Sequence, residues 1–277
     1  MKNIKKVSIL TQFGTPHEWT EEYFRNVGKL GQFGWYWKIF TPNKYDNVPD
    51  NVEIVPMTIE DFNNLYQEKL GYNPKNFLTD KGVPSKAVSD SMVAHGVLFE
   101  DYIKSYDFWC MANWDVVYGR LDHFLPDDFL STIDVFTDDV GIVNGVFSVF
   151  RNTPKVNRLF LQIPDIEKKL TTHKLFGIDE YDLITPIKRA SKAHEIVYRH
   201  PIYYPFHSYD RLIQHWENGP QLEIRADLSL WERFKDMKPP VGYINFPKGY
   251  IAREIMYFHF NYTKKWPYPQ YVIEKND

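Results

Sequence analysis

Short apolar runs that alternate with helical segments constrain the fold of this chain most. The runs are VSIL (7–10), WYWKIFT (35–41), VEIVPM (52–57) and DFWCM (107–111), and the helical patterns span 19–30, 59–71 and 84–106. Strands with continuous apolar runs are buried on both faces, as in a parallel sheet covered by helices. The order strand, helix, strand, strand, helix, helix, strand therefore predicts an α/β fold with a mainly parallel sheet flanked by helices.

Composition limits the classes of function. Of 277 residues, 43% are hydrophobic and 17% aromatic, so the chain can bury a large core and is not disordered. A net charge of −3 excludes a general electrostatic attraction to nucleic acid or anionic lipid, although a local basic groove remains possible. The single cysteine, Cys110, lies in an apolar run and is expected to be a core residue in a reducing compartment. No stretch has the length of a membrane span, and we expect a cytoplasmic protein.

The second half of the chain is less regular. Strands are predicted at 134–137 and at 143–152, the latter broken by Gly145, and a helix is predicted from 154 to 174. The remaining third is rich in Tyr, Trp and Pro and shows no regular period until 254–260. These features favour a single domain, 1–277, with an irregular C-terminal lobe.

A polar triplet, Asn113-Trp114-Asp115, separates the strand-like segments DFWCM and DVVYG. Burying a lone carboxylate costs several kcal/mol, so a strand that ends on Asp115 requires a partner for it. Ligands of parallel sheets bind beyond the carboxyl ends of the strands, which is where this triplet lies. Its oxygen donors suit a divalent cation that also binds substrate phosphates. The alternative is a strand end at which backbone amides bind Asp115.

The block from Pro84 to Leu125 resembles the nucleotide-binding half of GT-A glycosyltransferases, and is most similar to a bacterial and phage branch of them. The matching positions there are Lys86, Asp90, Tyr106, Asp107, Phe108, Trp109, Asp115 and Gly119. Later positions that resemble family motifs, in the same order, are Gly145, Arg151, Asn152, Asp179, Glu180, Tyr257, His259 and Phe260. The resemblance implies a GT-A fold, a Rossmann-like sheet with a nucleotide-sugar-binding half (1–152) and an acceptor-binding half (153–277).

One departure from the family pattern concerns the metal site. The first acidic position of the Asp-x-Asp motif is Asn113, and Arg120 follows Gly119 where an acidic residue is common. An amide keeps an oxygen donor but loses the charge. The resemblance is therefore compatible with a weaker metal site, or with a protein that binds a nucleotide sugar without turning it over.

The resemblance also implies roles for individual residues. Asp115 and His259 would hold Mn²⁺ or Mg²⁺, with Asn113 as a weaker ligand, and the histidine favours manganese. A nucleoside-diphosphate-sugar donor would be bound by Thr11, Gln12, Phe13, Gly14, Lys86, Asp90, Asn113, Trp114, Gly145 and Arg151. Two alternatives stay open, namely a surface ion pair between Lys86 and Asp90, which are four residues apart, and pairing of Arg151 with Asp134 or Asp107.

Candidate catalytic carboxylates are Asp179 and Glu180, which could deprotonate an acceptor hydroxyl if the enzyme inverts configuration. A solvated acidic loop is the alternative. The adjacent acidic pair 138–139 is a rival, although its sequence also fits a turn. His207, Asp210 and His215 have only a loose metal-like spacing, so no zinc site is predicted.

The resulting expectation is a glycosyltransferase that moves a sugar from a nucleoside diphosphate to an acceptor hydroxyl. The acceptor would be a surface glycan or polysaccharide, or a hydroxymethylated base of phage DNA, which would have to leave the helix stack. Basic residues that could follow a DNA strand are Lys188, Arg189, Lys192, Arg199 and Arg211. A non-catalytic nucleotide-sugar-binding or structural protein is the alternative class.

Overall fold

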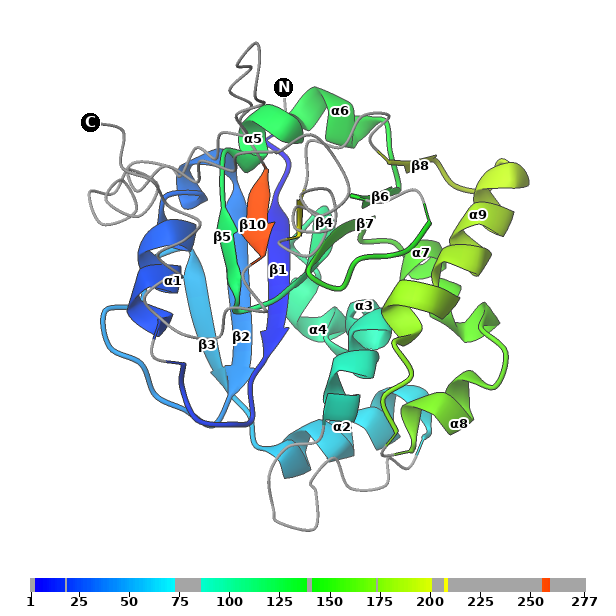
Figure 1. Ribbon diagram of the computed structural model, residues 1–277, viewed down its shortest axis with the longest axis horizontal. Coiled ribbons are helices and arrows are strands. Elements are labelled where there is room, and N and C mark those ends of the chain that lie inside the picture. Colours follow the sequence, from blue (N-terminus) through cyan, green and yellow to red (C-terminus); the bar gives the residue numbers. More distant parts are fainter. Residues whose placement is uncertain are drawn as a thin grey trace, which may run out of the picture.

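A seven-stranded sheet forms the centre of the molecule (Figure 1). The structure, a computed structural model, describes residues 3–17, 19–72, 86–138, 141–172, 174–200, 207–208 and 256–259. Within that part of the chain the strand order is β3-β2-β1-β4-β7-β6-β8. The strands are β1 (Lys6–Thr11), β2 (Trp35–Thr41), β3 (Val52–Pro56), β4 (Phe108–Ala112), β6 (Val135–Thr137), β7 (Phe147–Arg151) and β8 (Tyr198–Arg199).

The sheet is mainly parallel, as predicted. β1 pairs in parallel with β2 and β4, β2 with β3, and β6 with β8. β7 alone among these strands runs antiparallel to its neighbours β4 and β6. Its register places Phe147 beside Ala112 and Arg151 beside Phe108. The carboxyl end of β7 therefore lies at the sheet edge where the parallel strands begin.

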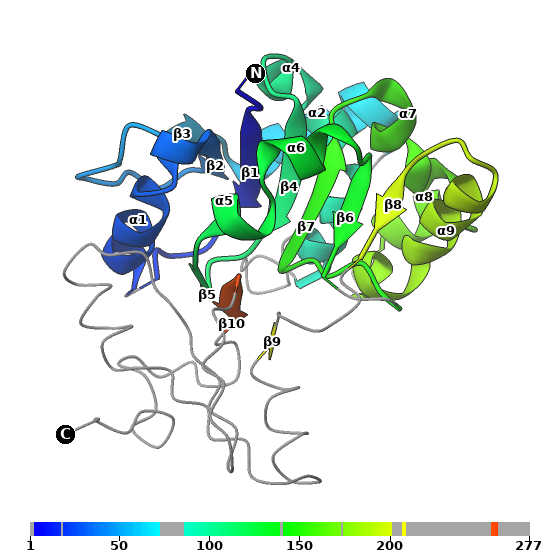
Figure 2. The same ribbon diagram turned by 90° about the horizontal axis from the view of Figure 1, so that it is seen from above.

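A second, three-stranded sheet explains the break in the strand-like sequence after Ala112. It consists of β5 (Val116–Tyr118), β10 (Tyr257–His259) and β9 (His207–Ser208), with β10 in the middle. β10 is antiparallel to β5 and parallel to β9. Asn113-Trp114-Asp115 thus joins the large sheet to the small one, and β5 and β10 lie side by side in both views (Figures 1 and 2).

Two apolar clusters lie on the two faces of the large sheet. Alternate side chains of β4 separate between them, Trp109 and Met111 into one and Phe108 and Cys110 into the other. Figure 2 shows α1 (Thr20–Gly28) and α5 (Leu121–Phe124) on one side of the sheet. The other side carries α2 (Ile59–Leu70), α3 (His95–Leu98), α4 (Glu100–Ile103), α7 (Pro154–Asn157), α8 (Ile166–Leu170) and α9 (Ile184–Lys192). The remaining elements are α6 (Asp127–Ser131), the 3₁₀ helices η1 (Gly31–Phe33), η2 (Lys86–Ala94) and η3 (Leu159–Gln162), and the π-helix η4 (Ile178–Asp182).

The predicted helices agree with the observed ones to different degrees. α2 agrees with the prediction, because Thr58 and Asp61 form a capping box and Gly71 ends the helix with a φ of 70°. The segment 84–106 is helical but divided into η2, α3 and α4 from residue 86 onward. The single helix predicted for 154–174 is wrong, since Ile163 precedes a proline and is extended, with a ψ of 129°.

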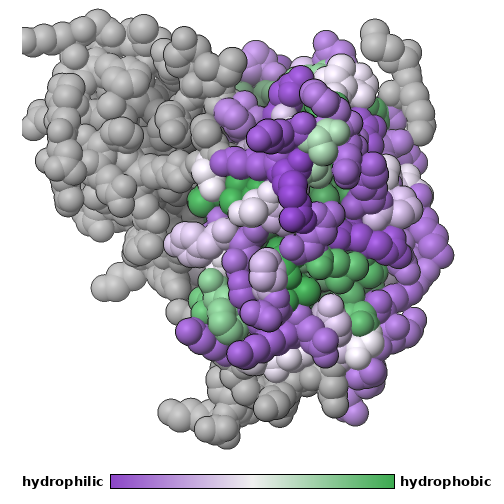
Figure 3. All heavy atoms as spheres, turned by 90° about the vertical axis from the view of Figure 1, so that its right-hand side faces the viewer, coloured by the Kyte–Doolittle hydropathy of each residue, from purple (hydrophilic) through white to green (hydrophobic). Residues whose placement is uncertain are grey.

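α9 was not predicted, although three of its apolar residues recur at helical spacing. Ile184, Ile187 and Ala190 are buried against the sheet, while Lys188 and Lys192 lie on the outer face. The side of the molecule that carries α8 and α9 is accordingly mostly hydrophilic, with a limited apolar area (Figure 3). Cys110 is fully buried and its pKa is raised by burial, as expected of a core residue. Among the described helices none is long and apolar enough to cross a membrane.

Candidate functional site

A cavity of about 230 Å³ lies at the carboxyl ends of β1 and β4. Three segments line it, namely the carboxyl end of β1 with the loop that follows, one side of η2, and the carboxyl end of β4 with the residues that follow. The lining residues are Ile9, Leu10, Thr11, Gln12, Phe13, Gly14, Thr15, His17, Val88, Ser89, Met92, Ala112, Asn113 and Trp114. Six residues that the sequence assigned to donor binding, 11–14 and 113–114, therefore share one cavity although a hundred residues separate them.

The exit of β1 is held in place from the exit of β2. The hydroxyl of Tyr45 donates to Oε1 of Gln12, whose Nε2 donates to the Thr15 carbonyl at 3.1 Å. Nδ2 of Asn43 donates to the carbonyl of Gly14 at 2.7 Å. Gly14 is exposed, and within the described part of the chain no atom beyond its two sequence neighbours lies within 4 Å of where a Cβ would be. Packing therefore does not require glycine here, and the backbone is open to a ligand.

Trp114 combines a packed ring with an unsatisfied donor. Its carbonyl accepts from Nε1 of Trp19 at 2.9 Å, and its ring lies 4.9 Å from that of Tyr23. The side chain is 7% exposed, and Nε1 has no acceptor within the described residues. A buried N–H without an acceptor costs about 1–3 kcal/mol. The nitrogen itself is closed off from solvent, so it does not reach the accessible space of the cavity.

The proposed metal ligands lie on adjacent segments. Asp115 is half-buried, directly before β5, and Asn113 is half-buried at the cavity. The β5–β10 register places the backbone of His259 opposite Val116, the residue after Asp115. The side chain of His259 lies outside the described residues. Among the described side chains, no group of three His, Cys, Asp or Glu is arranged to hold a metal ion.

Asp90 accepts hydrogen bonds from two backbone N–H groups. It is 1% exposed, and its two oxygens accept from the N–H groups of Phe176 at 2.8 Å and Ile178 at 3.0 Å. Burial raises the pKa of Asp90, while these backbone donors lower it. Lys86 is the first residue of η2, and its side chain lies outside the described residues. The sequence placed Asp90 at the donor, and the structure places it against the segment that precedes Asp179.

Asp179 is a buried carboxylate next to the cavity wall. It is 7% exposed, and burial, together with the charges of Glu180 and Asp90, raises its pKa to about 7. A Cβ on Gly145 would lie 2.0 Å from Oδ2 of Asp179 and 2.8 Å from the methyl of Met92. Because Met92 lines the cavity, Asp179 and Gly145 lie directly behind that part of the wall. Glu180, the second predicted base, is half-buried.

The first residue of the alternative acidic pair, 138–139, forms hydrogen bonds within the fold. Asp138, at the exit of β6, accepts from the hydroxyl of Tyr257 and from Nδ2 of Asn144 at 3.0 Å. The same Asn144 group donates to the Tyr257 hydroxyl at 3.0 Å. Asp138 thus connects β6 and the start of β7 to β10, while its neighbour at position 139 lies outside the described residues.

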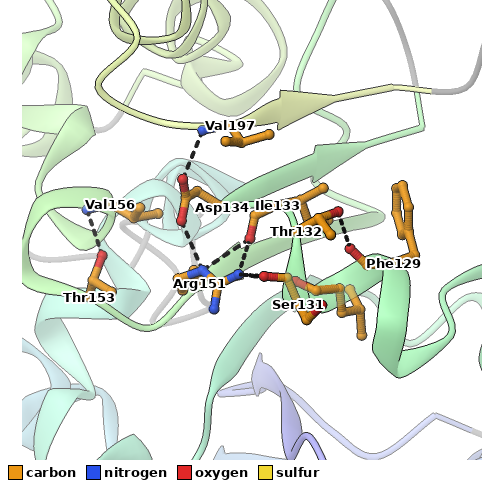
Figure 4. Close-up of polar contacts among 10 residues, drawn as sticks. Phe129, Ser131, Thr132, Ile133, Asp134, Arg151, Thr153, Val156 and Val197 are labelled. Carbon is orange, nitrogen blue, oxygen red and sulfur yellow. Dashed lines mark hydrogen bonds and ion pairs between the residues drawn. The ribbon is translucent and has the colours of Figure 1, made fainter.

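Arg151 lies at the opposite end of the strands from the cavity, and Figure 4 shows its polar contacts. Its Nε donates to Asp134 at 2.8 Å and to the Ile133 carbonyl at 3.0 Å, and Nη2 donates to the Ser131 carbonyl at 3.0 Å. Asp134 in turn accepts from the N–H of Val197, just before β8. The antiparallel direction of β7 causes this placement, and the pairing with Asp134 that the sequence left open is the one formed. Arg151 therefore lies outside the candidate site.

The sequence interpretation missed several residues that line the cavity or contact its lining. Asn43 and Tyr45 follow β2, and the strand-end rule that singled out Asn113-Trp114-Asp115 applies equally to them. His17 lines the cavity, with its ring stacked 4.5 Å from Trp19. Part of the predicted DNA-binding track and of the loosely spaced metal-like set lies outside the described residues, namely Asp210, Arg211, His215 and the side chain of His207.

A larger cavity, about 780 Å³, lies elsewhere, at the end of α1 and the amino ends of β2 and β3. Its lining residues are Glu21, Phe24, Arg25, Gly28, Gly31, Gln32, Tyr36, Asp46, Asn47, Pro49, Asp50 and Asn51. Open α/β sheets bind ligands at the carboxyl ends of their strands, so the smaller cavity is the candidate site despite its size.

Fold and cavity together define an α/β protein with a cavity at the carboxyl ends of two neighbouring parallel strands. The chain belongs to the family described as "Family of unknown function (DUF6625)", which matches residues 9–270. No curated protein matches the sequence of this chain. Among solved structures, the chain is similar to the glycosyltransferase GlyE of Streptococcus pneumoniae TIGR4, with 12% identity and a TM-score of 0.34. That likeness covers 72% of this chain and 46% of the GlyE chain, so the chain spans about half the length of GlyE, and it is too distant to carry an argument.

The placement of Arg151 leads to a prediction about stability. Arg151→Lys should lower the free energy of unfolding by about 1–3 kcal/mol, because an ammonium cannot reproduce the planar fork that bonds Asp134 and the neighbouring carbonyls. Nucleotide affinity should not change. Urea unfolding and calorimetry measure the two effects, and Arg158→Lys is the exposed control. A loss of affinity at unchanged stability would return Arg151 to the donor site.

Proposed function

We propose that this chain is a glycosyltransferase that binds a nucleoside-diphosphate sugar at the carboxyl ends of β1 and β4 and transfers the sugar to an acceptor hydroxyl. One observation carries the proposal. Residues 11–14 and 113–114, assigned to the donor on sequence grounds, line a single cavity with a buried carboxylate of raised pKa behind its wall. Binding sites commonly combine such a cavity with a few polar groups and a perturbed pKa.

The cavity suits the nucleoside part of the donor. At about 230 Å³ it is smaller than the roughly 300 Å³ at which ligand sites usually begin, so we assign it the base and ribose rather than the whole donor. Gly14 leaves its backbone open for close approach.

Asp115, Asn113 and His259 are the residues we assign to Mn²⁺ or Mg²⁺. A carboxylate and an amide oxygen two residues apart at a strand end are donors that these ions accept, and such ions commonly complete their coordination with substrate phosphates. When bound, the ion would stabilise the negative charge on the departing diphosphate. Because Asn113 is neutral, we expect weaker metal binding than a pair of carboxylates would give.

Asp179 is the base we propose, with Glu180 beside it. A general base is most effective when its pKa lies near the working pH, and the pKa of Asp179 is about 7. The acceptor hydroxyl would give its proton to this carboxylate while its oxygen forms a bond to the anomeric carbon. The bond between that carbon and the diphosphate oxygen breaks, and its electron pair leaves with the diphosphate.

A neutral glycan is the acceptor that the charges favour. Asp90, Asp179 and Glu180 lie together, and a group of carboxylates disfavours a polyanion such as DNA. The described basic residues of the alternative DNA track lie on or beyond α9, where Arg189 bonds Gln162. Salt-dependent binding to duplex DNA would instead support a DNA acceptor.

Metal-dependent nucleotide binding tests the donor site directly. Calorimetry with a panel of nucleoside diphosphates, with and without Mn²⁺, should give one nucleotide whose affinity rises with the metal. Asp115→Ala should lower that affinity at least about tenfold, because the carboxylate supplies the charge at the ion. Asp46→Ala, which alters an aspartate of the larger cavity, is the matched control and should bind as the wild type does. Failure of every nucleotide to bind would favour a structural protein. A loss of affinity in Asp46→Ala alone would place the nucleotide in the larger cavity instead.

The pH dependence of transfer tests the base. Since the carboxylate must be ionised to accept a proton, kcat should fall as the pH drops through about 7. Asp179→Asn should reduce kcat by at least about a hundredfold. A raised pKa means that ionised Asp179 costs stability above that pH, so the variant should be no less stable than the wild type at pH 8. Thermal melts and a pH–rate series measure both effects. Retained turnover would exclude Asp179 and leave Glu180 to be tested in the same way.

A further inference from the structure

The turn that precedes Asp179 is attached to η2 by a buried carboxylate. Asp90 accepts hydrogen bonds from the N–H groups of Phe176 and Ile178, and these are the residues on either side of Gly177. Both contacts span more than eighty residues of sequence. Each oxygen of Asp90 therefore fixes one side of a single turn.

The geometry of this turn determines where Asp179 lies. Gly177 has a φ of 65°, which a residue with a side chain adopts only at a cost. The π-helix η4 begins at Ile178, so the direction in which it starts is set by the two N–H groups that Asp90 holds. Asp179 is the second residue of η4, and its Oδ2 occupies the space that a Cβ on Gly145 would need.

The charges at this place are unusual for a purely structural contact. The negative charges of Asp90 and Glu180 raise the pKa of Asp179. The charge of Asp182 raises the pKa of Asp90, and Asp182 itself forms an ion pair with Lys169 at 2.6 Å. A neutral side chain could hold the turn without bringing a second negative charge to Asp179. Holding the turn with a carboxylate keeps Asp179 easier to protonate, which a base near neutral pH requires.

We propose that Asp90 is a positioning residue for the reaction, holding the 176–178 turn so that the carboxylate of Asp179 stays against Gly145 behind the donor cavity. The inference rests on the proposed function, because it assigns Asp90 to the base rather than to the donor.

Steady-state kinetics of Asp90→Asn in the full chain test this assignment. Asparagine offers one acceptor where aspartate offers two, and its amide N–H₂ would face a backbone N–H. We expect kcat to fall about tenfold while KM for the donor stays within about twofold, since only the base is displaced. Removing the negative charge should also lower the pKa of Asp179, so the acid limb of the kcat profile should move to lower pH. Asp101→Asn, at an exposed surface ion pair, is the control and should leave all three unchanged.

Gly177→Ala tests the same turn without touching a carboxylate. Gly177→Ala should lower kcat and leave KM for the donor unchanged. The acid limb of its kcat–pH profile should stay closer to that of the wild type, because no charge is removed. A rise in KM for the donor in Asp90→Asn, with an unmoved acid limb, would return Asp90 to the donor and overturn the inference. Loss of folding in both variants would also overturn it, because the contact would then support the fold rather than the base.

Failure of the proposed function is distinguishable from failure of this inference. If the wild type transfers and hydrolyses no nucleotide sugar, the proposed function fails. NMR titration of the Asp179 carboxyl carbon in wild type and in Asp90→Asn still measures the contact without turnover. An unchanged titration would contradict the link between the two carboxylates.

Discussion

The parallel pairing of β1 with both β2 and β4 is the constraint on which the candidate site depends. It brings three strand exits to one edge of the sheet, and these exits carry residues 11–14, 43–45 and 113–115. The contacts from Asn43 and Tyr45 to the first of these segments are a consequence of that arrangement. The apolar runs cause the strands to be buried on both faces of the sheet. They thereby also determine where the polar residues that follow the strands can contact a ligand.

The second wall of the site comes from parts of the chain that the sheet order does not determine. η2, the start of β7 and η4 meet where Met92, Gly145 and Asp179 come into contact. Gly145 allows this because any side chain there would displace the Asp179 carboxylate. The result is an acidic group close to a cavity that has room for a neutral ligand part, an arrangement suited to activating a hydroxyl rather than to binding a polyanion.

The sequence predicted the sheet well because continuous apolar runs leave few alternatives. β2 has the predicted bounds, and the change of sheet at Asn113 explains why polar residues interrupt two strand-like runs. It could not predict that β7 is antiparallel, which moves Arg151 to the far edge, because the apolar pattern of a buried strand contains no direction. The contacts of Asp90 were equally unpredictable, since its partners are backbone N–H groups more than eighty residues away.

The central claim is that a nucleoside diphosphate binds at the exits of β1 and β4. Photo-crosslinking with an azido-substituted nucleoside diphosphate, mapped by mass spectrometry with and without excess unlabelled nucleotide, tests it most directly. The account predicts competed adducts on peptides that contain residues 11–17 or 112–114. Competed adducts confined to residues 21–32 or 46–51, around the larger cavity, would contradict it.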